Sequence, residues 1–390
     1  METTKPLNPG ITGGNAVSEN TSASHFTWAE HHAAILEKGA EMPGGVGAMQ
    51  AVEPTDKLPG QKLPYFIRSG QGERYLAGGL VVNMLARGCD TGDLYEWVVI
   101  TGGKGAFFPS HVHQVTHEVL FVLEGEVEVW MNNTVYRCIK GDFVSIPPKT
   151  THAFRMATHR TQVLSITNGH RMSDLYRTLG QPYTGYVQPS DAISPLADQN
   201  FVPAQQVADI VFGQEPLTGQ AQRVTNTELP KAVVPYVLAA GEGDRYIIGD
   251  QLFTILSDNT TSDGKLLFVG TEGPAGEMIL KHFHQQHSES FFCVDGQMRM
   301  WANQSLLEVT PGDFVAIPAG VIHAYQLKSP YTRFVGLLTP GIFEDFFRSA
   351  TPYADHVYPQ VPGPGPNFKR VMQLDLVLVE RPPIPPGVPH

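Results

Sequence analysis

Three histidines and one glutamate stand at metal-ligand spacings in the first half of the chain. His111-Val112-His113 is followed by Glu118 and, further along, by His152. Because alternate residues of a strand point to the same face of a sheet, His111 and His113 place both imidazole rings on one side. Neutral imidazoles combined with a carboxylate are typical ligands of divalent first-row metals. This set therefore predicts a metal site.

The same pattern occurs again 171 residues later, as His282, His284, Glu289 and His323. Residues that are not candidate ligands recur at the same offset, including the pairs Pro64 and Pro235, Gly70 and Gly241, Arg74 and Arg245, Gly125 and Gly296, Asp174 and Asp345, and Arg177 and Arg348. An ungapped register of this extent indicates duplication of a whole domain. We therefore expect two equivalent metal sites. His117 and His287 stand at different offsets in the two copies, so neither is proposed as a ligand.

Short strands separated by turns are expected to position these side chains. Strands rich in Val, Leu and Phe follow each His-x-His pair, and further strands are expected over 135–139, 143–146 and 152–156. Glu124-Gly125 and Asp295-Gly296 are typical of β-hairpin turns, because glycine accepts a positive φ. Many short strands with frequent turns favour a β-barrel or jelly roll. The predicted fold class is all-β, with two tandem barrels and short helices over 174–179 and 343–349.

The length of 390 residues suits about two domains. We divide the chain into a partly disordered N-terminal extension with a short helix over 28–38, a first barrel, a connecting segment, a second barrel and a Pro-rich tail. Their expected ranges are 1–60, 61–178, 179–231, 232–350 and 351–390. The last ten residues are expected to form extended polyproline.

Composition limits the partners and the compartment. A net charge of -11 without a basic run argues against nucleic acid. No stretch is long enough to cross a bilayer, and no signal-peptide pattern opens the sequence, so we expect a cytoplasmic protein. Cys89, Cys138 and Cys293 are isolated and are expected to be small buried hydrophobes. No dinucleotide fingerprint occurs, so no organic cofactor is expected. A homodimer is the candidate assembly.

The pattern Gly-x5-His-x-His-x4-Glu-x6-Gly, followed by Gly-x5-Pro-x-Gly-x2-His, resembles the double motif of the cupin superfamily. The second copy matches this motif up to Gly320 and His323, whereas the first copy has Lys149 in place of the glycine. Both copies lack the asparagine that often ends the motif, and have Met156 and Leu327 there. The resemblance implies jelly-roll β-barrels, and therefore two cupin domains.

Within the cupins, residues from about 63 to 374 are similar to the bicupin quercetin 2,3-dioxygenases, or flavonol 2,4-dioxygenases. The similarity rests on five stretches: Pro64-Tyr-Phe-Ile-Arg-Ser-Gly-Gln-Gly-Glu-Arg-Tyr75, His111-Val-His-Gln-Val-Thr-His-Glu118, Val234-Pro-Tyr-Val-Leu238, His282-Phe-His-Gln-Gln-His-Ser-Glu-Ser-Phe-Phe292 and Pro340-Gly-Ile-Phe-Glu-Asp-Phe-Phe347. The extension and the Pro-rich end lie outside it.

The resemblance implies a metal-dependent dioxygenase that opens the heterocyclic ring of a flavonol such as quercetin with O2. Carbon monoxide would be released and a phenolic ester, the depside, would remain. The partners would be a small aromatic substrate and O2. Glu118 and Glu289 would accept the proton of the substrate's 3-hydroxyl as general bases. The metal ligands would be His111, His113, Glu118, His152, His282, His284, Glu289 and His323. Each domain would hold up to one divalent first-row ion, and we expect a redox-active one among Fe, Mn, Cu, Ni and Co.

Two other functions remain open. One is a metal-dependent bicupin of different chemistry, either oxalate-decarboxylase-like or a cyclase or isomerase of a phenolic metabolite. The other is a non-enzymatic, pirin-like metal-binding cupin. An oxalate site would need a cationic residue over the metal, whereas the residues flanking these ligands are mostly apolar. Bicupins of the seed-storage type lose the ligands, and all eight are present here, which favours an enzyme.

Aromatic and methionine residues near the ligands are candidates for contacts with a flat substrate. For each single residue, packing in the barrel core is the interpretation that we favour. These residues are Phe107, Phe121, Trp130, Phe154 and Met156 in the first copy, and Phe291, Met298, Met300, Trp301 and Tyr325 in the second.

Overall fold

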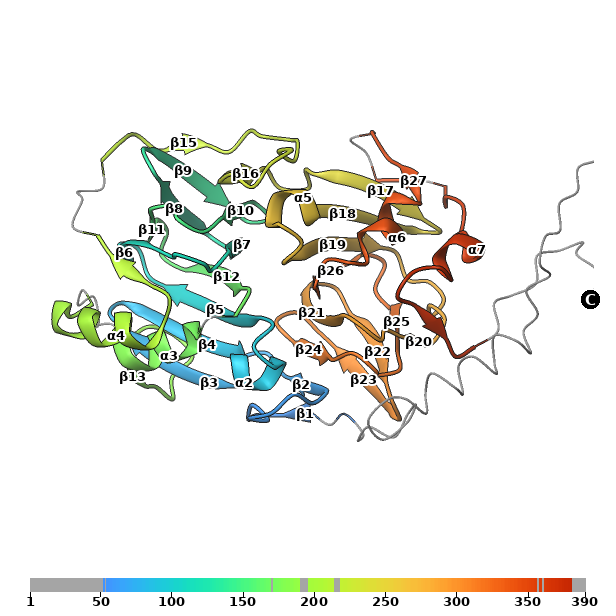
Figure 1. The fold of residues 1–390 in the computed structure, drawn as a ribbon, viewed down its shortest axis with the longest axis horizontal. Helices are drawn as coiled ribbons and strands as arrows, with labels where there is room; N and C mark the ends of the chain where they lie inside the picture. The colour runs from blue at the N-terminus through green and yellow to red at the C-terminus, as the bar shows by residue number, and fades with distance from the viewer. Residues whose placement is uncertain are drawn as a thin grey trace, which may run out of the picture.

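The computed structural model describes residues 52, 54–169, 171–189, 196–213, 218–355, 358–359 and 361–380. Two β-barrels lie side by side, one formed mainly by the N-terminal half and the other by the C-terminal half (Figure 1). Each barrel contains one large and one small sheet, as the all-β prediction requires. The helix expected over 28–38 and the polyproline expected over 381–390 lie outside the described residues.

The N-terminal barrel has a large sheet of order β13-β3-β4-β5-β12-β7-β10-β16 and a small sheet of order β14-β6-β11-β8-β9-β15. The large sheet comprises β3 (Glu73–Ala77), β4 (Leu80–Ala86), β5 (Glu96–Gly102), β7 (Glu118–Glu124), β10 (Phe143–Ile146), β12 (Thr161–Thr167), β13 (Gln181–Pro182) and β16 (Tyr236–Leu238). The small sheet comprises β6 (Phe107–Val112), β8 (Glu126–Met131), β9 (Thr134–Ile139), β11 (His152–Met156), β14 (Val211–Phe212) and β15 (Gln222–Arg223).

The C-terminal barrel has a large sheet of order β1-β2-β24-β21-β26-β19-β18-β17-β27 and a small sheet of order β23-β22-β25-β20-β28. The large sheet comprises β1 (Pro54–Thr55), β2 (Tyr65–Ile67), β17 (Asp244–Ile248), β18 (Gln251–Ser257), β19 (Leu267–Gly273), β21 (Ser288–Asp295), β24 (Phe314–Ile317), β26 (Thr332–Thr339) and β27 (Thr351–Pro352). The small sheet comprises β20 (His282–Phe283), β22 (Met298–Ala302), β23 (Ser305–Val309), β25 (His323–Leu327) and β28 (Val377–Leu378).

Short helices flank the barrels. They are α2 (Gly88–Thr91), α3 (Met172–Leu179), α4 (Phe201–Val207), α5 (Asn259–Ser262), α6 (Glu344–Arg348) and α7 (Phe368–Val371), with a 3-10 turn at Asp198–Asn200. The helices predicted over 174–179 and 343–349 are confirmed as α3 and α6. Leu175 and Tyr176 of α3 pack into the N-terminal core. Among the described residues, no helix is long and apolar enough to span a membrane.

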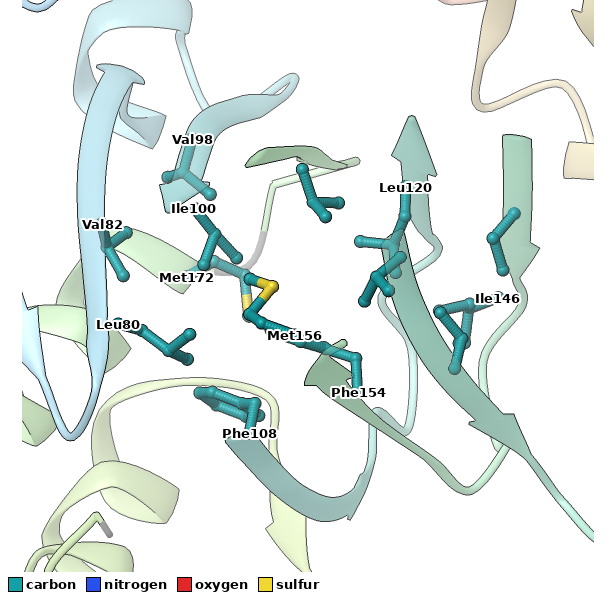
Figure 2. Packing of buried hydrophobic residues seen from close by; sticks show 14 of the residues in the cluster. Leu80, Val82, Val98, Ile100, Phe108, Leu120, Ile146, Phe154, Met156 and Met172 are labelled. Atoms are coloured by element: carbon teal, nitrogen blue, oxygen red, sulfur yellow. The ribbon is translucent and has the colours of Figure 1, made fainter. Parts of the chain in front are cut away.

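The core of the N-terminal barrel is filled from both of its sheets. Phe108 and Phe154 of the small sheet stack with ring centroids 5.4 Å apart. Leu120 and Ile100 of the large sheet join the same cluster, and Met156 lies among them (Figure 2). Burial of these side chains contributes roughly 1.5–3 kcal/mol each to the free energy of folding. The metal-site strands are therefore held by a continuous apolar core.

The two barrels exchange a strand. Strand β2 of the N-terminal half pairs with β24 of the C-terminal barrel, and β16 pairs with β10 of the N-terminal barrel (Figure 1). Two aspartates at repeat-equivalent positions secure this exchange: Asp313 Oδ1 accepts the Ser69 N–H at 2.7 Å, and Asp142 Oδ1 accepts the Ala240 N–H at 2.8 Å. The chain segments that complete each barrel thus cross the expected division between the domains.

Aromatic residues fill the interface between the two large sheets. Trp97 contacts Phe314 with ring centroids 5.3 Å apart, and Phe143 stacks on Phe268 at 5.5 Å. All four side chains are fully buried. Because these rings come from both halves, the barrels form one packed unit through this interface.

The hairpin prediction at Glu124-Gly125 and Asp295-Gly296 is wrong. Strands β7 and β8 belong to different sheets, as do β21 and β22. Gly125 has a φ of 71°, and a side chain there would lie 2.2 Å from the Arg160 carbonyl oxygen. The glycine therefore turns the chain from one sheet into the other at a crowded corner. The cysteine prediction is also wrong in part, because Cys138 and Cys293 are buried but Cys89 is exposed.

Candidate metal centres

The four predicted N-terminal residues lie together inside the first barrel. His111 on β6 is the cross-strand partner of His152 on β11, while Glu118 opens β7 and His113 follows β6. One donor atom from each of the four lies within 4.8 Å of the donors of the other three. All four side chains are at most 2% exposed. This geometry can hold one metal ion between two neighbouring strands of the small sheet and one strand of the large sheet.

The second barrel gathers the equivalent residues with one difference. His282, His284 and His323 offer donors within 4.8 Å of one another. Glu289 lies beside them, with Oε2 3.0 Å from His323 Nε2 and Oε1 3.4 Å from His284 Nε2. Its carboxylate thus turns both oxygens toward imidazoles. In the first barrel, Glu118 turns only Oε2 toward His152 and His113, at 3.1 and 3.5 Å.

Backbone carbonyl groups orient all six imidazole rings. The Nδ1 atoms of His111 and His152 donate to Pro109 and Thr150 oxygens, each at 2.8 Å. His282 and His323 make the equivalent bonds to Leu280 and Val321, at 2.8 and 3.0 Å. A proton on Nδ1 leaves the Nε2 lone pair free for a metal ion, and such partners fix both the tautomer and the ring orientation.

The remaining histidine of each His-x-His pair is oriented by a segment far along the chain. His113 Nδ1 donates to the Asp209 carbonyl oxygen at 2.5 Å, and His284 Nδ1 donates to the Asp375 carbonyl oxygen. The Nε2 atoms of His113 and His284 are buried without a hydrogen-bond partner. A buried, unpartnered imidazole nitrogen facing other donors is the state that a metal ion would satisfy.

Burial and charge set the protonation states. Burial, with the neighbouring His323, lowers the pKa of His282 to about 3, and burial with His152 lowers the pKa of His111 well below its usual range. Burial alone would raise the pKa of Glu118, but hydrogen bonds from His113 and His152 lower it well below the ordinary value. His282 and His111 are therefore neutral and Glu118 is ionised at neutral pH, as metal ligation requires.

Asp209 and Asp375 are positioning residues that our sequence interpretation missed. Asp209 accepts the backbone N–H groups of residues 114, 115 and 116 at 2.8–2.9 Å, and Asp375 accepts those of 285, 286 and 287 at 2.8–3.1 Å. Each aspartate thus fixes the loop between the His-x-His pair and the glutamate. Each also precedes a short strand, β14 or β28, that pairs with the strand carrying the first histidine.

A weak signal for these aspartates exists in the sequence. Asp209-Ile-Val-Phe212 and Asp375-Leu-Val-Leu378 form a second repeat, with an offset of 166 instead of 171 residues. The changed offset hides it from a search in one register. Asp209 falls in the expected connecting segment and Asp375 in the expected tail, and both segments contribute a strand to a barrel.

The structure places His287 in the C-terminal site, although its register excluded it from the predicted ligands. Its Nδ1 donates to Asp375 Oδ2 at 2.8 Å, and its Nε2 lies 3.6 Å from Glu289 Oε1. His117 instead turns away from the ligands, and its Nε2 lies 2.8 Å from Ser145 Oγ. The position equivalent to His287 is Thr116, whose hydroxyl donates to Asp209 Oδ2 at 2.8 Å.

Some of the aromatic and methionine candidates face the barrel interiors and others do not. Phe154 and Met156 lie in the core of the first barrel, where Phe108 joins them. Phe291, Met298, Met300 and Tyr325 share a core cluster of the second barrel. The other four lie elsewhere: Phe121 packs in the interface between the barrels, Phe107 and Trp130 pack on a separate cluster, and Trp301 lies under the Lys281 ammonium. Strand alternation decides this division.

Comparison with known proteins identifies the family. A family model described as cupin domain matches residues 98–167 and 271–332. A quercetin 2,3-dioxygenase of Bacillus subtilis is 43% identical over 84% of this chain and 98% of its own length. A quercetin 2,3-dioxygenase of Aspergillus japonicus is 31% identical over 31% of this chain and 37% of its own. Oxalate decarboxylase of Bacillus subtilis covers 69% of this chain and 74% of its own, at 14% identity and a TM-score of 0.45. The chain belongs to the quercetin 2,3-dioxygenase family of bicupin enzymes.

Proposed function

We propose that this protein is a metal-dependent dioxygenase that opens the heterocyclic ring of a flavonol such as quercetin with O2, releasing carbon monoxide and a depside. One observation carries the proposal. In both barrels, three buried imidazoles have their Nδ1 atoms bonded to backbone carbonyl groups and turn Nε2 toward a shared point beside a carboxylate. This donor set suits a first-row divalent metal with an open position.

The proposed ligands are His111, His113, Glu118 and His152 in the first barrel, and His282, His284, Glu289 and His323 in the second. A bound redox-active ion would act as a Lewis acid toward the substrate's oxygen atoms. Fe, Mn, Cu, Ni and Co remain the candidate ions, with up to one ion in each barrel.

Glu118 and Glu289 are the proposed general bases. The low pKa that the neighbouring imidazoles give each carboxylate keeps it ionised at neutral pH and able to accept a proton from the 3-hydroxyl. Apolar neighbours exclude water around the base: Phe108 contacts His111 with ring centroids 4.9 Å apart, and Phe291 contacts His323 at 6.4 Å. A proton transfer inside such a site is shielded from solvent.

The neighbours of the ligands favour a flat aromatic substrate over oxalate. In the first barrel the four side chains contact one another, backbone carbonyl groups, Ser165 and the rings of Phe108 and Phe212. An oxalate dianion would gain most from a cation beside the metal, whereas a flavonol gains from apolar contacts. Flavonol cleavage is therefore the better-supported function.

The experiment is reconstitution of metal-free protein with each candidate ion in turn, followed by incubation with quercetin in oxygenated buffer. We expect loss of the yellow flavonol absorbance together with one carbon monoxide for each quercetin consumed. The same protein without O2, and the double variant His152→Ala/His323→Ala with O2, serve as controls and should be inactive. If no ion supports carbon monoxide release, the proposal is wrong, and a parallel incubation with oxalate tests the alternative chemistry.

A further inference from the structure

The two carboxylates of the candidate metal centres are held by different partners. In the first barrel, the Ser165 hydroxyl donates to Glu118 Oε1 at 2.6 Å, and both groups are buried. In the second barrel, the repeat-equivalent residue is Gly336, which has no hydroxyl. His287, backed by Asp375, faces Glu289 Oε1 in its place at 3.6 Å.

The strand register explains how Ser165 reaches the carboxylate. Ser165 on β12 pairs with Leu120 on β7, two residues from Glu118 on the same face. Side chains in this diagonal relation are close enough to interact. Gly336 on β26 pairs with Phe291 on β21 in the same way. The backbone geometry is thus the same in both barrels, and the side chain alone makes the difference.

The hydroxyl changes how many carboxylate oxygens face the imidazoles. With Oε1 bonded to Ser165, Glu118 turns only Oε2 toward His152 and His113. Without such an anchor, Glu289 turns Oε2 toward His323 and Oε1 toward His284. A carboxylate that offers one oxygen leaves one more position open on an ion than a carboxylate that offers both.

We propose that Ser165 is a positioning residue that holds Glu118 with a single oxygen toward the metal position, and that Gly336 and His287 release the C-terminal carboxylate from this constraint. The first barrel then keeps an open position for substrate, whereas the second tends toward a closed coordination shell. The turnover part of this inference rests on the proposed dioxygenase function. The coordination part does not.

Single-site backgrounds separate the two barrels: His323→Ala leaves the N-terminal site and His152→Ala leaves the C-terminal site. In the first background we expect Ser165→Ala to lower kcat for quercetin about 10-fold and to leave KM within about 2-fold, because outer-shell partners act on the orientation of the ligand. The visible spectrum of bound Co²⁺ should change, while the Co²⁺ dissociation constant should change less than kcat.

Ser145→Ala is the matched control. Ser145 is a buried serine on the same sheet that bonds His117 and not Glu118, and its repeat equivalent is already Ala316. This variant should keep the parent's kcat and Co²⁺ spectrum. Ser165→Gly, the residue that the second barrel carries at this place, repeats the test if the alanine variant folds poorly.

A transplant provides the reverse test. In the His152→Ala background, Gly336→Ser with His287→Thr copies the N-terminal arrangement into the second barrel. A Cβ at Gly336 would meet its nearest atoms at 3.7–3.8 Å, which is ordinary contact. We expect kcat to rise toward that of the N-terminal site, and the Co²⁺ spectrum to approach that of the first barrel.

Two results would overturn the inference. One is a Ser165→Ala variant whose Co²⁺ spectrum matches that of its parent, and the other is a Ser145→Ala variant that shows the same change as Ser165→Ala. Neither depends on quercetin. If no ion supports quercetin cleavage, the proposed function fails, and the Co²⁺ spectra still decide whether Ser165 orients Glu118.

Discussion

The two barrels carry the same four donor residues at the same spacing, but they surround them differently. Glu118 is anchored by a hydroxyl from the neighbouring strand, and Glu289 faces an imidazole that an aspartate supports. The loop before each glutamate is fixed by the same device, an aspartate that accepts three backbone N–H groups. The comparison teaches that the repeat has kept the donors and the loop anchor, and has varied the group that orients the carboxylate.

The largest expected effects come from removing one site at a time. His152→Ala and His323→Ala should each abolish tight metal binding in one barrel and leave about one ion per chain if both sites load. Turnover should fall further in His152→Ala, because the first barrel has the anchored carboxylate. Metal analysis and carbon monoxide release measure the two quantities. Retention of two ions by His152→Ala would remove His152 from the ligands, and equal turnover in the two variants would break the comparison.

Glu118→Gln should lower turnover by roughly 10²–10⁴-fold while metal binding falls less, because the amide keeps an oxygen donor but cannot act as the base. Glu289→Gln should cost less turnover than Glu118→Gln for the reason given above. Steady-state kinetics beside metal titration measures both variants. Equal loss of metal and turnover in Glu118→Gln would make this residue a ligand only.

Asp209→Ala and Asp375→Ala test the shared loop anchor. Each change leaves three backbone N–H groups without their acceptor, so we expect metal affinity to fall about 10- to 100-fold in the affected barrel alone. Asp375→Ala should also free His287 and so have the larger effect. Co²⁺ titration in the single-site backgrounds measures this. A loss that spreads to both barrels would mean that the aspartates support the whole fold.

The smallest expected effect concerns Lys149 and its equivalent Gly320. Both residues are left-handed, with φ of 68° and 90°, and both donate their N–H to the carbonyl of the second histidine of the pair, His113 or His284. A left-handed non-glycine residue costs roughly 1–2 kcal/mol. Lys149→Gly should therefore raise the free energy of unfolding by about 1 kcal/mol without changing metal content, and Gly320→Lys should lower it. Thermal unfolding measures this, and a loss of metal in Lys149→Gly would contradict it.

Much of the fold was predictable because it depends on local pattern. The strands over 143–146 and 152–156 lie as predicted, because short apolar runs between turn residues have few alternatives. The duplication was visible because the two barrels share an ungapped register of 171 residues. The eight donor positions follow from residue type and spacing within three strands and one loop, and the structure brings each set of four together.

Other features depend on contacts between distant segments. The turn at Gly125 has the sequence of a hairpin, and only the packing of its flanking strands into two sheets shows that it is a corner. Strand β2 looks like the start of the first barrel, yet it pairs with β24 because the two barrels complete each other's large sheets. Local pattern cannot reveal such pairing, because many strands compete for one edge.

The sequence by itself determined the two donor sets, their duplication and the all-β fold, since all three are expressed in residue types at fixed spacings. The tertiary structure decided what holds those donors. Asp209 reaches a loop that lies 93–95 residues earlier in the chain, and Ser165 reaches a carboxylate 47 residues earlier. Hydrogen bonds between segments so far apart exist only after the barrel closes, so the difference between the two sites emerges from packing.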